Sequence, residues 1–351
     1  MGPPSLRASA GLIDDKLNLS EVLTMTVQAN TAVKQPSPKK LPFKARLMKS
    51  LRLLWKNIKR DKALLLIVLP VVVHYLVFVY YPMYGNIIAF KNYSPVLGIS
   101  GSEWVGFKYF EQFFTSPYFF RVLRNTLLIS IYSLIWAFPV PIIFALALND
   151  LRNGPFKRIV QTVSYIPYFI STVIICGLLV NFLSPSSGII NTIIQMFGGE
   201  PINFLMEPSW FRTIFIASGI WQGFGWSSII YLAALTGINP ELYEAATVDG
   251  ATKLQQILHV SIPCILPTIV VIFVMNIGTL MSVGYEKLIL LYNPITLDVA
   301  DVISSYVYRT GLVEGNYSFG SAVGLFNSVV NLILVVAANK ASKKLTDVSL
   351  W

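Results

Sequence analysis

Long apolar runs alternate with shorter polar connections along most of this chain. Each run has 18 to 27 residues, and about 20 helical residues suffice to cross the hydrocarbon core of a bilayer. The runs lie at residues 63–83, 122–148, 159–183, 211–235, 264–283 and 322–339. The pattern predicts an all-α membrane protein with six transmembrane helices.

One polar stretch, residues 239–267, separates the fourth run from the fifth and carries clear helix signals. Asn239 suits the N-cap of a first helix. Gly250 predicts the end of that helix, because glycine readily takes the left-handed conformation that closes one. Thr252 and Gln255 have the spacing of a capping box, which begins a second helix. Two short helices that meet at an elbow are typical of a docking device.

The composition agrees with a membrane protein, since 54% of the residues are hydrophobic and only 13% are charged. The net charge of +10 does not indicate nucleic-acid binding. Eleven of the 27 Lys and Arg residues fall between Lys34 and Lys62, opposed only by Asp61. Such a concentration beside the first span is typical of a cytoplasmic flank. Residues 1–62 are therefore interpreted as a basic cytoplasmic segment, partly disordered.

The charges between the later runs predict the topology. The connection 149–158 is basic, whereas the connection 184–210 contains no Lys or Arg, so inside and outside alternate as the positive-inside rule requires. Both termini are then expected in the cytoplasm. The predicted organisation is a six-span domain over residues 63–340, with a cytoplasmic loop at 239–263 and a tail at 341–351.

Several kinds of chemistry have no residues to support them. The sequence has no GxxxxGK[ST] phosphate loop, and its two histidines, His74 and His259, lie in different segments, so we predict no catalytic and no metal site. Ionisable groups well inside the spans are absent apart from His74, which argues against ion-coupled transport. A membrane-embedded enzyme would need clustered acids or histidines near the interface, and this sequence has none. An uncoupled channel stays open as an alternative.

The spans instead contain uncharged polar and aromatic side chains. Amides and hydroxyls can bind the OH groups of a sugar, and aromatic faces suit its C–H faces, so the set predicts a pathway for a polyhydroxylated solute. Ordinary packing between helices is the alternative, although interhelical hydrogen bonds contribute only about 0.6 kcal/mol on average. The candidate pathway residues are Tyr165, Gln222, Trp226, Tyr231, Asn276, Thr279, Asn327 and Asn331.

The polar stretch is acidic, with Glu241, Glu244 and Asp249 against Lys253 alone. A helix that rests on the anionic inner leaflet is normally rich in Lys and Arg. The acidic stretch is therefore predicted to bind a protein rather than lipid.

The run EAATVDGATKLQQILHVSIP at 244–263 resembles the EAA loop of membrane subunits of bacterial ABC importers. The resemblance extends over about residues 60–351. SYIPYFIS at 164–171, DVISSYVYRTGL at 301–312 and the terminal Leu350-Trp351 resemble the oligosaccharide branch of that family, including the larger membrane subunit of alginate-oligosaccharide importers.

The resemblance implies a type I importer permease in the bacterial inner membrane that carries an oligosaccharide, such as alginate or another uronate-containing one. A different sugar is the alternative. The partners implied are a second six-span permease, usually a different chain, two cytoplasmic ATPases and an extracytoplasmic binding protein. ATP and Mg would act on the ATPases, and this chain would bind no cofactor. The external connections 84–121 and 284–321 would contact the binding protein. The ATPase-docking residues would be Glu244, Ala245, Ala246, Asp249, Gly250 and Ala251.

Overall fold

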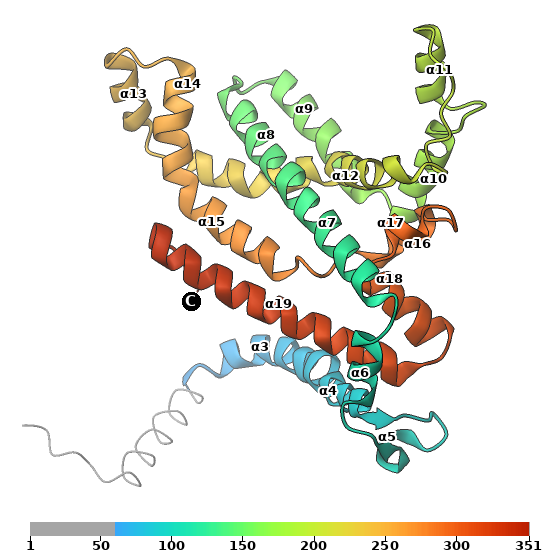
Figure 1. The fold of residues 1–351 in the computed structure, drawn as a ribbon. Coiled ribbons are helices and arrows are strands. Elements are labelled where there is room, and N and C mark those ends of the chain that lie inside the picture. Colours follow the sequence, from blue (N-terminus) through green and yellow to red (C-terminus); the bar gives the residue numbers. More distant parts are fainter. Residues whose placement is uncertain (1–59, 351) are drawn as a thin grey trace, which may run out of the picture. The chain divides into compact units, whose positions relative to one another are not determined.

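The computed structural model describes residues 60–350, so the predictions for the basic N-terminal segment lie largely outside the described residues. The described chain is almost entirely helical (Figure 1). The described residues also contain one two-stranded antiparallel sheet, formed by β1 (Lys91–Asn92) and β2 (Glu103–Trp104). The described residues fall into two separate units, 60–78 and 79–350. The all-helical prediction is confirmed at this level.

The first predicted span is a helical stretch over Lys62–Phe90. It consists of α3 (Lys62–Tyr75), a π-helical turn (Leu76–Tyr80), α4 (Tyr81–Met83) and a 3-10 helix (Tyr84–Phe90). No residue of α3 is buried, and aliphatic side chains surround it on all sides. A helix that is apolar all around requires lipid or other helices as its surroundings.

The second predicted span follows two short outer helices, α5 (Gly98–Gly101) and α6 (Lys108–Phe114). It is built from α7 (Phe119–Ala137) and α8 (Pro139–Asp150), which Figure 1 shows as one long rod. Pro139 does not break this rod, because it stands at the first position of α8, where no intrahelical N–H bond is required.

The third predicted span is not one continuous helix, and this expectation needs correction. It consists of α9 (Pro155–Tyr165), a 3-10 turn (Ile166–Phe169) and α10 (Thr172–Phe182), with a bend of 102° between the two parts. Ser171 starts α10 afresh by accepting a hydrogen bond from the backbone N–H of Ile174. Pro167 in the 3-10 turn and the new N-cap at Ser171 together account for the break.

The fourth predicted span corresponds to α12 (Pro208–Thr236), which follows the short α11 (Ile189–Met196). Among the described residues, four helices are long and apolar enough to cross a membrane, or five if the bent pair counts as one span. The helix α12 has 29 residues but is not among them. By helix length and hydropathy alone, the described residues thus support fewer than six membrane crossings.

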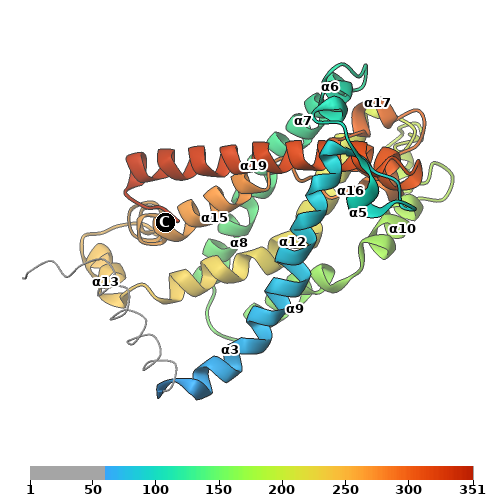
Figure 2. The same cartoon turned by 90° about the horizontal axis from the view of Figure 1, so that it is seen from below.

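The remaining helices belong to the loop after α12 and to the last two predicted spans. Figure 2 shows α15 (Ile262–Gly278) and α19 (Tyr317–Thr346) running alongside one another, and they pack together. The predicted sixth span ended at residue 339, whereas α19 continues to Thr346. Between α15 and α19 lie α16 (Tyr285–Leu291), α17 (Leu297–Ala300), α18 (Ile303–Val307) and a π-helical turn (Tyr308–Val313).

Three apolar clusters hold the second unit together. One joins α6 and α7 to α18 and α19, one joins α10 and α12 to α16 and α17, and one joins α8 and α12 to α15. A buried carboxylate ties the α16–α19 segment to α7. Asp301 is fully buried and pairs with Arg121 at 3.1 Å and with Arg309 at 2.8 Å. Two guanidinium groups compensate the cost of burying this one charge.

The closest backbone approach between α12 and α9 occurs at Gly225. A Cβ atom placed on Gly225 would lie 2.1 Å from the carbonyl oxygen of Ser164. Only a residue without a side chain permits this contact, and α12 could otherwise not pack against the end of α9.

We expect Gly225→Val to destabilise the protein by about 1–3 kcal/mol or more, because the added atoms overlap backbone that cannot move aside. Gly223→Ala is the matched control, since nothing lies within 4 Å of a Cβ at Gly223 and alanine favours the helix. Thermal unfolding of the detergent-solubilised variants, followed by size-exclusion chromatography, measures the difference. Equal melting temperatures for the two variants would contradict the proposed packing.

Candidate functional site

The helix α13 (Pro240–Val248) has the cap at each end that the sequence predicts. The Asn239 side chain accepts a hydrogen bond from the backbone N–H of Glu241 at 3.1 Å. At the other end Gly250 has a φ of +78°. The N–H of Ala251 donates to the carbonyl of Ala246 at 2.9 Å, and the N–H of Gly250 donates to the carbonyl of Thr247 at 3.1 Å. These two bonds form a Schellman motif, so the elbow at Gly250 is confirmed.

The second helix of the loop, α14 (Lys253–Gln256), begins with the predicted capping box. The Gln255 Oε1 accepts from the backbone N–H of Thr252 at 2.7 Å, and the Thr252 Oγ1 accepts from the backbone N–H of Gln255 at 3.4 Å. A π-helical turn (Ile257–Ser261) then continues directly into α15, so that residues Lys253–Gly278 form one helical stretch. The second loop helix is therefore not a separate short element. It is the beginning of the fifth predicted span.

Side-chain hydrogen bonds hold α13 against this stretch. The Tyr243 hydroxyl lies 2.9 Å from the Ser261 Oγ, and the Gln256 Nε2 donates to the Thr247 Oγ1 at 3.0 Å. Gln256 and Ser261 are buried. A buried donor or acceptor such as those of Gln256 and Ser261 is costly to leave unpaired. The four residues Tyr243, Thr247, Gln256 and Ser261, which we call the clasp, therefore fix the angle between α13 and the stretch that begins with α14.

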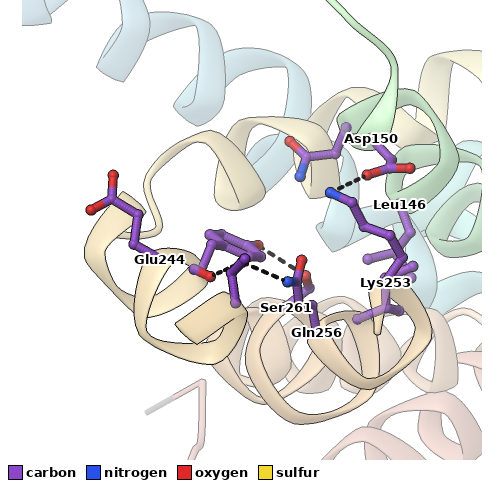
Figure 3. Close-up of a pocket in the computed structure, with 10 residues that line it drawn as sticks. Leu146, Asp150, Glu244, Lys253, Gln256 and Ser261 are labelled. Atoms are coloured by element: carbon purple, nitrogen blue, oxygen red, sulfur yellow. Dashed lines mark hydrogen bonds and ion pairs between the residues drawn. The ribbon is translucent and has the colours of Figure 1, made fainter. Parts of the chain in front are cut away.

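A cavity of about 490 Å³ lies beside the clasp, between the loop and the end of α8. Figure 3 shows Lys253 reaching across it to Asp150, and the Lys253 Nζ lies 3.0 Å from the Asp150 Oδ1. Both side chains are more than half exposed, so this ion pair contributes little to stability. Figure 3 also shows the Glu244 carboxylate pointing away from Asp150 and Lys253.

The loop presents acidic and apolar groups to its surroundings. Glu244, Ala245, Asp249 and Gly250 are exposed, and Ala246 and Ala251 are partly exposed. Large apolar side chains are also exposed, most of all Val248 at 87% and Leu254 at 65%. Exposed apolar groups among acids are typical of a protein-binding surface and not of a helix that rests on anionic lipid.

A second cavity, of about 710 Å³, lies between α7, α12 and α15. Three of the predicted pathway residues line it, namely Tyr231, Asn276 and Thr279. Serine hydroxyls from three segments of the chain also line it, and its wall has no Lys, Arg, Asp or Glu in the described chain. We refer to it as the polar cavity. Aliphatic and aromatic side chains form the rest of the lining, and this mixture of hydroxyls, one amide and apolar faces suits an oligosaccharide.

The other predicted pathway residues lie elsewhere. Gln222 donates to the carbonyl of Ile170 at 3.2 Å, at the break in the third span, and Trp226 stacks on Tyr168 with ring centroids 4.9 Å apart. Tyr165, at the end of α9, is partly buried and outside the lining of the polar cavity. These contacts tie α12 to the exposed backbone at the bend of the third span.

The two asparagines predicted on the sixth span differ from one another. Asn331 accepts from the backbone N–H of Met281 at 3.0 Å and donates to the Ser282 Oγ at 2.9 Å, which joins α19 to the segment after α15. The Asn327 Oδ1 is buried and has no hydrogen-bond partner among the described residues. Neither asparagine lines the polar cavity.

The sequence analysis did not identify the clasp or the buried Lys287 of α16. The clasp residues are polar positions on the inner faces of two helices, and their pairing depends on the angle at Gly250. Lys287 is in a predicted external connection, and no pattern in the sequence indicates that it is buried.

The apolar helices, the polar cavity between them and the uncovered loop define a membrane transport subunit. The chain belongs to the family described as the inner membrane component of binding-protein-dependent transport systems, matched over residues 137–346. The predicted family is thus confirmed.

Relatives and solved structures agree with this membership. The chain is 47% identical over 300 residues to the polygalacturonan/rhamnogalacturonan transport system permease protein YteP of Bacillus subtilis (strain 168), covering 86% of this chain and 93% of that protein. It is 44% identical to Protein LplB of the same organism, over 84% of this chain and 92% of that protein. A chain in the crystal structure of a bacterial alginate ABC transporter, in complex with an alginate pentasaccharide-bound periplasmic protein, is 45% identical, with a TM-score of 0.78 over 85% of this chain and 99% of that one.

Gln256→Ala removes the hydrogen bond to Thr247. We expect it to lower the free energy of opening α13 away from α14 by about 1 kcal/mol, so that backbone amides of α13 exchange roughly five times faster. Lys253→Ala removes only an exposed ion pair and serves as the control, with exchange across α13 unchanged. Hydrogen–deuterium exchange with mass spectrometry makes the comparison. A larger effect of Lys253→Ala than of Gln256→Ala would show that the clasp does not hold the loop.

Proposed function

We propose that this chain forms half of the translocation pathway of an ATP-driven, binding-protein-dependent importer of oligosaccharides. The observation that carries the proposal is the loop 239–263, whose exposed helix α13 is clasped to a helical stretch continuous with α15. Family membership supports the same conclusion. An uncoupled channel would have no use for a loop of this construction.

The geometry suggests how ATP hydrolysis elsewhere would move this chain. In the proposal, two cytoplasmic ATPase subunits hold the surface formed by Glu244, Ala245, Ala246, Asp249, Gly250 and Ala251. Because the clasp joins α13 to the start of α15, a displacement of the loop displaces α15 as well. The helix α15 contributes Asn276 to the polar cavity, so movement of the loop would reshape that cavity. ATP and Mg act at the ATPase subunits.

The proposed topology has six spans in the bacterial inner membrane, with both termini in the cytoplasm. The helix α12 would be the additional crossing, since its 29 residues span about 43 Å. Serines, glycines and Gln222 lower the mean hydropathy of α12, and its polar residues Ser218, Ser228 and Tyr231 are buried. The basic connection 149–158 and the loop 239–263 then lie on the same, cytoplasmic side.

The cargo we propose is an oligosaccharide that contains uronate. The hydroxyl, amide and aromatic lining of the polar cavity supports a sugar. Support for acidic sugars comes from the relatives, which include a polygalacturonan/rhamnogalacturonan permease and an alginate transporter. A different sugar carried by a permease of the same family is the alternative.

The proposed assembly contains a second six-span permease, most simply a different chain, that completes the pathway. An extracytoplasmic binding protein delivers the cargo, in keeping with the periplasmic protein bound to the alginate transporter. The connections 84–121 and 284–321 are the segments available to contact it.

We expect Glu244→Arg to abolish cargo-stimulated ATP hydrolysis by the reconstituted complex, because it reverses an exposed charge in the docking surface. Gly250→Pro should do the same, since proline cannot adopt a φ of +78° and lacks the N–H that Thr247 binds. The affinity of the binding protein for the cargo should not change.

Glu200→Arg is the matched control for charge reversal, because Glu200 is exposed and lies in the predicted external connection. It should leave stimulated hydrolysis intact. Full stimulation in both Glu244→Arg and Gly250→Pro would refute the docking assignment.

A further inference from the structure

Lys287 is a buried cation without an acidic partner. Its residue is 9% exposed, and no carboxylate among the described residues lies within ion-pair distance of its Nζ. The Nζ donates one hydrogen bond, to the carbonyl oxygen of Phe215 at 3.0 Å, and lies 5.0 Å from the centre of the Phe215 ring. An ammonium group has three N–H donors, so its hydrogen-bonding capacity is largely unused.

The surroundings of Lys287 make its charge costly. Burial lowers the pKa of Lys287 to about 8, and the nearby Cys176 thiol opposes that shift only in part. The ammonium is therefore still mostly protonated at neutral pH. Asp301, the other fully buried charge in this region, has two arginine partners. An unpaired buried charge of this kind is more often functional than structural.

The position of Lys287 connects it to the polar cavity. Phe215 and Gly284 both line that cavity, and Lys287 follows Gly284 by three residues. The Lys287 Nζ thus contacts Phe215, a residue of the cavity lining, while Lys287 itself is not part of that lining. The Nζ also lies near Gly219 of α12, where an added Cβ would be in ordinary van der Waals contact with it at 3.6 Å.

We propose that Lys287 is a specificity-determining residue that binds the carboxylate of a uronate unit in the polar cavity. The inference rests on the proposed oligosaccharide import and adds the group that distinguishes acidic from neutral sugars. The described residues that line the polar cavity carry no charge, so a carboxylate bound there needs a cation from outside the lining to neutralise it. The flexible side chain of lysine lets the ammonium turn toward the cavity. A carboxylate would then accept hydrogen bonds from the ammonium N–H groups that do not bond Phe215.

The first test compares import of a galacturonate oligosaccharide with import of its methyl ester into proteoliposomes that contain the complete complex. The ester differs from the free acid by one added methyl group on each carboxyl and by the loss of its negative charge. Lys287→Met should reduce import of the free acid roughly tenfold, the loss expected for a charge-assisted contact, and leave import of the ester unchanged. Lys287→Arg should restore most of the discrimination. Lys108→Met removes an exposed lysine of the other external connection and should have no effect.

The second test uses the wild-type complex and does not depend on how a variant folds. In the vanadate-trapped complex, modification of Lys287 by an amine-reactive reagent is quantified by mass spectrometry. The free acid should protect Lys287 at least about tenfold more than the ester, and Lys108 should react equally in both samples.

Each outcome decides between the alternatives. Equal loss of both cargoes in Lys287→Met, or protection of Lys287 before any cargo is added, would assign the lysine to an acidic group of the partner permease and overturn the proposal. An unchanged acid-to-ester ratio together with no protection by the free acid would overturn it as well. If wild-type complexes import neither cargo but do import a neutral oligosaccharide, the proposed cargo class itself fails.

Discussion

The arrangement of the loop 239–263 depends on a single backbone turn, at Gly250. Its φ of +78° lets α13 end in a Schellman motif and fold back on α14 within four residues. The clasp between Tyr243, Ser261, Thr247 and Gln256 forms only because that turn brings the inner faces of the two helices together. Once the clasp is made, Glu244 and Asp249 and the apolar Val248 and Leu254 stay exposed.

A second constraint acts inside the membrane domain, where polar groups must find partners without water. Gln222 satisfies the exposed carbonyl of Ile170 at the bend of the third span, and Asn331 satisfies the backbone after α15. Asp301 is satisfied by two arginines. The polar side chains of the polar cavity and the nearby Lys287 ammonium are the groups available to a cargo, and several of them already donate to backbone carbonyls.

The sequence could predict those features that depend on neighbouring residues. The caps at Asn239 and Thr252, the elbow at Gly250 and the family follow from local patterns, and all are confirmed. Features that depend on contacts between distant segments could not be predicted. Polarity and spacing selected eight pathway residues, but only Tyr231, Asn276 and Thr279 line the polar cavity, because a polar residue in a span serves helix packing as readily as a pathway. The burial of Lys287 arises from the way α16 folds against α10 and α12, which no local pattern records.

The central claim is that the loop 239–263 is the surface that the ATPase subunits hold. The most direct measurement places a photo-crosslinking amino acid at Ala245, on the exposed face of α13, in the complete complex. The account predicts crosslinks from this position to the ATPase subunit, and none from the same amino acid at Trp104 in the connection 84–121. Crosslinks from Ala245 to lipid alone, or equal crosslinking to the ATPase from both positions, would contradict it.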